Sequence, residues 1–417
     1  MKKAGWMASG AVLAVGIAAL AAAAPAPATG PATGGGTATY WMTADTMSGM
    51  GGLMGAGGGR RAIMGAMLGR GGGMGNGFVR TLRLQLGGTA RPAGEPSAEH
   101  DVPPGLQVGP SLPLVSPHAV VTSSEPEPTQ WPTNVERPRG RILIYWGCGE
   151  HARPGQPVVI DFATIQSGHM PPAFASMNFH SETPPSAGRF PTYGEWPNQR
   201  SQTRVPDNGS LVGDHVVRGN YSPEIHFTLA PGQDFLAPVT LVSNAKSPSG
   251  SVPVVWQPVG GARAWFAMAM GAGQNGDMVI WSSAESQTFA MAMDDLPDNE
   301  IARLVQQRVL MPAPTDRCTV PSEVAQAGQG MMYTLTAFGG ESNFSHPLRP
   351  ARAPASWHPD WTVKFRSKSA YMGLLGMNMN EMTGGHAAQD RGDHDQGDQG
   401  KKKKRGILGG LGGMIPH

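Results

Sequence analysis

The chain has 417 residues, of which 59 are glycine and 38 are proline, and charged residues make up only 15%. This glycine and proline content exceeds that of an ordinary globular domain, so part of the chain is expected to lie outside any packed core. The formal net charge of +2 excludes a nucleic-acid binder that works through the charge of the whole chain.

The first 28 residues have the layout of a secretory signal peptide. Lys2 and Lys3 supply the charged start, an alanine-rich apolar run covers residues 11–24, and small residues with prolines follow. The alternative is an uncleaved membrane anchor, because residues 6–24 are just long enough to span a bilayer. Prolines directly after the run favour cleavage. The sequence therefore predicts export to the periplasm, the outer envelope or the extracellular space.

A glycine- and methionine-rich segment, residues 29–77, is predicted to be a disordered linker, because glycine at this density costs too much backbone entropy to fold alone. Its arginines leave open a second interpretation, an adhesive segment for an anionic surface. Residues 78–138 are predicted to hold one alternating strand, 78–86, and then a proline-rich extended segment with a short extended piece at 112–115.

Residues 139–245 are predicted to form a first β-sandwich-like domain. The nearly continuous apolar run 141–146 is typical of a strand buried on both faces. Short strands with turn residues between them, and no helical period, favour a sandwich. Further strands are predicted at 157–163, 211–217, 223–229 and 235–242.

Inside this domain, residues 164–210 are predicted to form a long proline-rich loop that carries many aromatic side chains. Loops of this length are usually functional or disordered, and the aromatic residues argue against disorder. One interpretation is a binding loop that presents Tyr193 and Trp196 to a partner, and the other is a structural flap packed on the sheet. The candidate binding residues are Tyr193, Trp196, His169 and His180.

Residues 250–376 are predicted to form a second β-sandwich-like domain. Its start reads Val254-Val255-Trp256-Gln257-Pro258-Val259-Gly260-Gly261-Ala262, with Trp265 on the next strand. This stretch, about residues 252–281, resembles a fibronectin type III or immunoglobulin-like sandwich, and the resemblance implies a fold but no function.

Within the second domain, Gln274-Asn275-Gly276 predicts a hairpin between two apolar runs. One short helix is predicted at 298–310, with Asp298 as its cap and Pro312 beyond its end. Later strands are expected at 331–338 and 361–365. The fold class is therefore mainly β, with two β-sandwich-like domains, one short helix, a disordered N-terminal arm and a disordered C-terminal tail.

The two cysteines, Cys148 and Cys318, are predicted to form a disulfide, because an even cysteine count in an oxidising compartment favours pairing. Cys148 with His151 gives one Cys-x-x-His pair, but no second pair stands at zinc spacing.

A repeated motif offers candidate metal ligands. Phe266-Ala267-Met268-Ala269-Met270 recurs as Phe289-Ala290-Met291-Ala292-Met293, and residues two apart share one face of a strand. Soft thioether sulfurs select Cu(I). The alternative, which we favour, is that the methionines fill a core. The candidate copper ligands are Met268, Met270, Met291 and Met293.

Residues 377–417 are predicted to be a disordered tail, rich in His and Asp and then basic. Its cluster of positive charges suggests peripheral contact with an anionic surface. This cluster consists of Lys401, Lys402, Lys403, Lys404 and Arg405.

No sequence motif of a known catalytic site stands out in the chain. We therefore predict a non-enzymatic, envelope-associated binding or scaffold protein, which contacts an envelope protein or polysaccharide and no nucleic acid. The first alternative is a periplasmic copper-handling protein. The second is a polysaccharide-acting hydrolase, for which acids brought together by the long loop would be required.

Overall fold

The structure is a computed structural model that describes residues 36–55, 77–117, 140–161, 179–287 and 293–377. The predicted signal segment and the basic cluster 401–405 lie outside these ranges. Within them, no helix combines the length and apolar character needed to cross a membrane.

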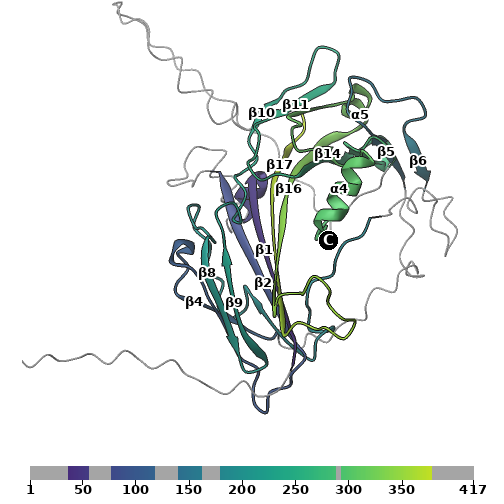
Figure 1. Cartoon of the computed structure of the whole chain (residues 1–417). Coiled ribbons are helices and arrows are strands. Elements are labelled where there is room, and N and C mark those ends of the chain that lie inside the picture. Colours follow the sequence, from purple (N-terminus) through teal and green to yellow (C-terminus); the bar gives the residue numbers. More distant parts are fainter. Residues whose placement is uncertain (1–35, 56–76, 118–139, 162–178, 288–292, 378–417) are drawn as a thin grey trace, which may run out of the picture.

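The described part of the chain is mainly β, as predicted, and most of its strands belong to one large sheet of ten strands, here called the long sheet (Figure 1). Its strands are β1 (Ala38–Gly49), β2 (Phe78–Gly88), β5 (Arg141–Trp146), β6 (Val158–Asp161), β7 (Thr192–Trp196), β12 (Ala264–Ala272), β13 (Met278–Ser282), β14 (Met311–Pro312), β16 (Gln329–His346) and β17 (Trp361–Leu374). They are ordered β6-β5-β13-β12-β16-β17-β1-β2-β7, and β14 pairs with β12 beside this path.

Two smaller sheets accompany the long sheet. One has the order β4-β3-β8-β9 and the other β10-β11-β15. Their strands are β3 (Ala98–Asp101), β4 (Ser111–Leu114), β8 (Gly213–Gly219), β9 (Ser222–Leu229), β10 (Leu241–Asn244), β11 (Val252–Trp256) and β15 (Arg317–Val320). The short helical segments are α1 (Met50–Gly55), η1 (Pro104–Leu106), η3 (Gln274–Gly276), α4 (Asp298–Gln306) and α5 (Ser322–Ala327).

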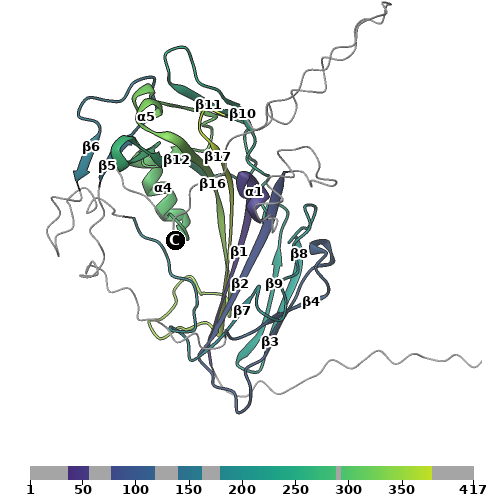
Figure 2. The ribbon, with the colours of Figure 1, turned by 180° about the vertical axis from the view of Figure 1, so that it is seen from behind.

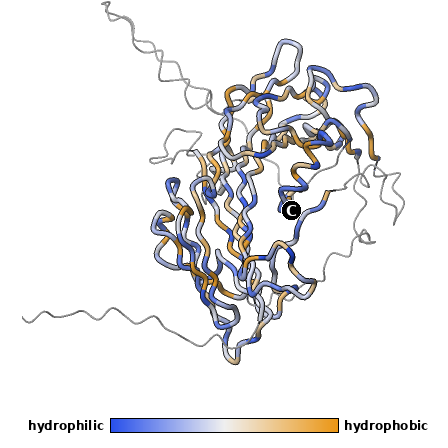
Figure 3. The backbone as a smooth tube through the Cα atoms, viewed as in Figure 1, coloured by the Kyte–Doolittle hydropathy of each residue, from blue (hydrophilic) through white to orange (hydrophobic). Residues whose placement is uncertain are grey.

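Both smaller sheets cover the same face of the long sheet, here called the inner face. Val363 and Phe365 of β17 belong to the core under the four-stranded sheet, and Tyr371 belongs to the core under the three-stranded sheet. These three residues are separated by even numbers of positions on one strand, so their side chains share a face. Figure 3 shows the alternation of apolar and polar residues along the paired strands that produces this arrangement. Helix α4 lies on the opposite, outer face in both views (Figures 1 and 2).

The predicted linker contains a central strand of the long sheet. Strand β1 pairs in parallel with β17 and antiparallel with β2, and Tyr40, Met42 and Ala44 on it are buried. The prediction of a linker for residues 38–49 is therefore wrong. Glycine further along the segment dominated its average composition and hid a local alternation of buried and outward residues.

The two cores are not divided at the predicted domain boundary. Strand β5, from the first predicted domain, pairs in parallel with β13, and its Tyr145 lies in the core of the second. Trp361, from the second predicted domain, lies in the core of the first. The strands that form one sandwich-like layer therefore come from both predicted domains, because pairing between distant strands is not visible in a local pattern.

Several local predictions are confirmed, and two need correction. Strands at 78–86, 141–146 and 223–229 are present, and β12 and β13 form the predicted hairpin. The strand predicted at 235–242 begins only at Leu241, because the residues before it cross from one small sheet to the other. Helix α4 is present, but Pro297 occupies its N-cap position, and Asp298 Oδ1 instead accepts a hydrogen bond from the Glu341 backbone N–H at 3.0 Å.

The crossing segment before β10 is attached to the inner face of β1. Thr46 Oγ1 donates a hydrogen bond to the Leu236 carbonyl at 2.7 Å, and Ser48 Oγ donates to the Val239 carbonyl at 2.7 Å. Both hydroxyl-bearing residues are buried, so each needs a partner there. The two polar contacts thus fix the passage of the chain between the two cores.

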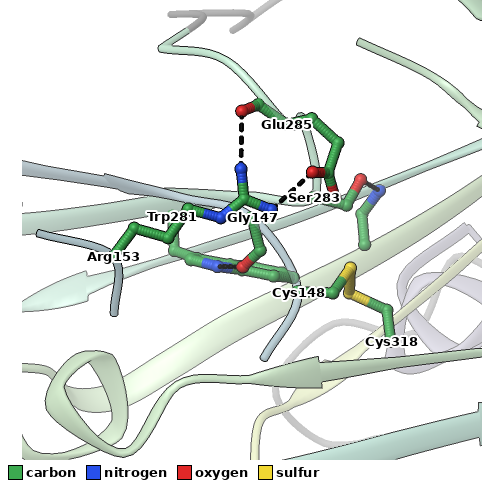
Figure 4. Close-up of a disulfide and its surroundings, with 8 residues drawn as sticks. Gly147, Cys148, Arg153, Trp281, Ser283, Glu285 and Cys318 are labelled. Atoms are coloured by element: carbon green, nitrogen blue, oxygen red, sulfur yellow. Dashed lines mark hydrogen bonds and ion pairs between the residues drawn. A yellow bond between two sulfur atoms is a disulfide. The ribbon is translucent and has the colours of Figure 1, made fainter. Parts of the chain in front are cut away.

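The predicted disulfide is present, and Figure 4 shows it with its surroundings. It joins Cys148, which follows β5 in the long sheet, to Cys318 on β15, and the sequence separation is 170 residues. Next to it, Trp281 Nε1 donates to the Gly147 carbonyl at 2.9 Å. The bridge therefore ties the long sheet to the three-stranded sheet across their shared core.

Two histidines and a tyrosine form a buried chain of hydrogen bonds in the core under the four-stranded sheet. The Tyr40 hydroxyl lies 2.8 Å from His100 Nδ1, His100 Nε2 lies 2.9 Å from His215 Nδ1, and His215 Nε2 lies 2.7 Å from the Leu211 carbonyl. Because the carbonyl only accepts, we assign Nε2–H to both rings, and the hydroxyl then donates to His100. Both imidazoles are neutral in this arrangement.

The stability of the protein is expected to fall as the pH drops below about 6.5. Burial lowers the pKa of His100 well below its ordinary value, and burial also lowers the pKa of His215. The unfolded chain therefore binds more protons than the folded protein at mildly acidic pH, and the stabilisation present above about pH 6.5 is lost as the pH falls. Urea unfolding at pH 7.5, 6.5 and 5.5 measures this slope.

Asp45 changes the stability with pH in the opposite direction to the two histidines, because burial raises the pKa of its carboxyl to about 6. Its contribution to stability is present at low pH and is lost as the pH rises through about 6. The Asp45→Asn variant is therefore expected to show a steeper loss of stability on acidification, and a double His100→Gln, His215→Gln variant a flatter one. An unchanged slope in the double variant would contradict the assignment to the histidines.

Candidate functional site

The outer face of the long sheet carries a cavity of about 240 Å³, here called the outer-face cavity. Its floor spans four neighbouring strands, and Phe266, Thr336, Ala370 and Met47 stand in one row across β12, β16, β17 and β1. With about 4.8 Å between strands, this row is about 14 Å wide. Met293, in the segment before α4, lies over the floor and completes the lining.

The two ends of the outer-face cavity differ in polarity. At the β12 end, Phe266 and Met268 belong to one apolar cluster with Met293 and α4. At the β1 end the lining is charged, with Asp45 on β1, Lys368 on β17 and Asp294 from the segment before α4. Threonine and alanine side chains lie between the ends. The cavity is therefore a shallow groove with one apolar and one charged end.

Lys368 connects the two carboxylates of the charged end. Its Nζ lies 2.5 Å from Asp294 Oδ1 and 4.0 Å from Asp45 Oδ2. Asp45 Oδ1 is buried and has no hydrogen-bond partner among the described residues. Burial lowers the pKa of Lys368, but Asp45, Asp294 and the neighbouring Asp295 outweigh this effect and raise it.

A buried ion-pair network adjoins the charged end. Arg366 and Glu341 are each about nine-tenths buried, and Arg366 Nε donates to Glu341 Oε2 at 2.7 Å. Glu182 pairs with both Lys364 and Arg366. Trp41 lies beneath the two cations, with its ring centroid 5.3 Å from Lys364 Nζ and 4.8 Å from Arg366 Cζ. The face of an aromatic ring attracts cations at such distances.

A segment of the predicted long loop is attached across the outer face. Ser181 Oγ donates to the Asp294 carbonyl at 2.7 Å, and the Glu182 backbone N–H donates to the Asp295 carbonyl at 3.1 Å. Further along, Gln85 Nε2 donates to the Pro185 carbonyl at 3.0 Å. These contacts hold the segment that delivers Glu182 to the network, so this part of the loop is a structural flap.

The candidate binding residues of the long loop have different surroundings. Tyr193 and Trp196 lie on β7, an edge strand of the long sheet, and are only 5% and 2% exposed. The prediction that they form an exposed contact surface is wrong, because the strand buries Trp196 in a core and Tyr193 donates to Glu195 Oε2 at 2.6 Å. The His180 side chain is exposed, and its backbone N–H donates to Glu300 Oε1 at 2.9 Å. His169 lies outside the described residues.

The four candidate copper ligands are only partly brought together. Met268 and Met293 line the outer-face cavity, and Met270, although on the same face, packs with Ile142, Ile144 and Ile280 further along the sheet. Met291 lies outside the described residues. Met47 also lines the cavity but stands three strands away from the Met268 strand, too far for both thioethers to bind one ion. Copper binding stays a prediction.

Sequence reasoning missed the residues of the charged end. The sequence around β17 reads WTVKFRSKSAYMGL, in which Lys364, Arg366 and Lys368 alternate with inner-face residues. A strand with a row of charges on one face and aromatic residues on the other is a readable signal of a polar outer face. Asp45 could not be recognised as a site residue, because its strand lies within the segment that was predicted to be a linker.

No protein-family model matches the sequence of this chain, and no curated protein is significantly similar to it. In the described ranges, no three His, Cys, Asp or Glu side chains are grouped in a way that suits a metal ion. The outer-face cavity is therefore the candidate site of this protein.

Proposed function

We propose that this chain is an exported binding protein without catalytic activity, and that its ligand occupies the outer-face cavity. The observation that carries the proposal is the cavity itself, a groove of about 240 Å³ whose lining runs from apolar to charged. Binding sites combine an apolar lining with a few placed polar groups, and this cavity has that composition. Export is proposed from the signal-peptide layout of residues 1–28.

The arrangement of the carboxylates supports binding rather than glycoside hydrolysis. A glycosidase places one carboxylic acid and one carboxylate on either side of the bond that is cleaved. Here Asp45 and Asp294 both face Lys368, which lies between them and offsets one of their two negative charges. Such an ion triplet suits the recognition of a head group at the end of the groove.

A bulky side chain in the middle of the floor is expected to abolish binding. Ala370 lies in the row that crosses the floor, so Ala370→Trp fills the cavity between its two ends. We expect the neutral fluorescent probe 1-N-phenylnaphthylamine to bind the parent protein at one site and to bind the variant at least about tenfold more weakly. Fluorescence titration gives both dissociation constants.

The matched control is Val242→Trp. Val242 on β10 is 57% exposed and lies outside the cavity, so the same bulky residue there should leave probe binding unchanged. Melting temperatures of both variants show whether each is folded. If the probe binds the folded Ala370→Trp variant as tightly as the parent, the proposed site is wrong.

A further inference from the structure

The charge balance at the β1 end of the outer-face cavity leaves room for one cation. The lining there contributes two carboxylates, Asp45 and Asp294, against the single ammonium of Lys368. Beyond the lining, Asp295 and Arg83 also act on Asp45 and carry opposite charges, so the excess of one negative charge remains. Lys368 is already paired with Asp294 at 2.5 Å, and an anionic ligand group would meet two carboxylates at close range. A positively charged head group would pair with the remaining carboxylate, whereas a negatively charged one would be repelled by both carboxylates.

The hydrogen-bonding state of Asp45 locates this cation. Its Oδ2 faces Lys368 at 4.0 Å, whereas its Oδ1 is buried without a hydrogen-bond partner among the described residues. A buried acceptor without a partner costs free energy, and a donor supplied by a ligand recovers it. A primary ammonium has three N–H donors and a compact charge, which suits one free carboxylate oxygen.

The apolar end of the cavity specifies the remainder of the ligand. Phe266 and Met268 lie on β12, three strands away from Asp45 on β1, and Met293 packs in the same apolar cluster. None of the three side chains carries a charge. Methionine side chains adapt to irregular apolar shapes, so the pocket suits a flexible chain as well as a ring. Between the two ends, Thr334, Thr336 and Ala370 contribute small side chains that leave space for such a chain. Phe338, paired with Lys368 across β16 and β17, adds an apolar surface beside the charged end.

We propose that the ligand is an amphiphile with a primary ammonium head bound at Asp45 and an apolar chain that extends over β17 and β16 toward Met268. This rests on the proposed function of the cavity as a binding site. The shared chemistry is an amine on an apolar body, and the free alkylamine is the simplest probe of it.

Three probes with the same chain test the head group. Isothermal titration with octylammonium, octanol and octanoate at pH 7 should give octylammonium a dissociation constant at least about tenfold lower than either of the others. Asp45→Asn keeps the side-chain shape and should remove this preference. The matched control, Asp316→Asn, changes an exposed aspartate that is not part of the cavity lining, and this variant should retain the preference for octylammonium.

The pH dependence of the parent protein provides a second measurement that needs no variant. Asp45 faces four charged groups from the elements packed against it, namely Arg83, Asp294, Asp295 and Lys368. Burial raises its pKa to about 6, so only about a tenth of it is ionised at pH 5 in the empty cavity. Octylammonium should therefore bind about tenfold more weakly at pH 5 than at pH 7, whereas octanol should bind equally at both.

The outcomes separate this inference from the proposed function. Equal affinity for the three probes would contradict the ammonium head and leave the cavity as a binding site. Tightest binding of octanoate would overturn the inference in favour of Lys368 as the head-group partner. No binding of any probe, together with no binding of 1-N-phenylnaphthylamine, would overturn both.

Discussion

Removal of the Cys148–Cys318 bridge should lower the free energy of unfolding by about 5 kcal/mol. The bridge closes a loop of 170 residues, and the loss of chain entropy in the unfolded state grows with the logarithm of the loop length. Equilibrium urea unfolding of the parent protein and of a Cys148→Ala, Cys318→Ala variant measures the difference.

Reduction of the parent protein is the control for this measurement, because it opens the bridge without changing the core. Cys318 is buried, so substitution removes packing as well as the bond. Reduced parent and double variant should lose similar amounts of stability, with the variant slightly worse. A loss below about 1 kcal/mol in the reduced protein would show that the bridge does not restrict the unfolded chain in the way the loop length implies.

Arg366→Met should destabilise the protein by about 3–5 kcal/mol, because it removes one partner from a buried ion pair. Glu341 is about nine-tenths buried and accepts from Arg366 through two nitrogens. Without the guanidinium, its carboxylate is left in the interior with Lys364 and the amide of Asn343 as its remaining partners. Methionine keeps much of the side-chain volume, so the loss reports mainly the charge.

The double variant Arg366→Met, Glu341→Met distinguishes a charge effect from a packing effect. Replacing both members of a buried pair by apolar residues is often nearly neutral, so the double variant should be more stable than Arg366→Met alone. Arg352→Met, at an exposed position, is the control for the substitution itself and should change stability by less than about 0.5 kcal/mol. A double variant that is less stable than the single one would assign the loss to packing.

The local elements of this fold are largely predictable, and their pairing is not. The alternation in β2 and β9, the hairpin after β12, the short helix α4 and the disulfide are all visible in residue patterns. The parallel pairing of β1 with β17 joins residues more than 300 positions apart, and no local pattern encodes it. The two cores draw residues from both predicted domains for the same reason.

The candidate site depends even more on strand pairing that the sequence does not reveal. Met268 and Met293 are recognisable from the repeated Phe-Ala-Met-Ala-Met motif, and both line the outer-face cavity. Asp45 and Lys368 face each other only because β1 and β17 are neighbours, so their chemistry depends on the unpredicted pairing. Conversely, Tyr193 and Trp196 are of residue types that dominate interfaces, but an edge strand places them in the interior.

The position of β1 between β17 and β2 determines when the protein can fold. Strand β17 is near the end of the described chain, and the centre of the long sheet is incomplete until this strand has been synthesised. Contacts between such distant residues form slowly, because the entropy of closing the intervening chain must be overcome first. Strand β1 is therefore expected to wait, paired with β2 alone, until β17 has been synthesised. This order of events would expose one edge of β1 on the nascent chain while the residues between the two strands are made.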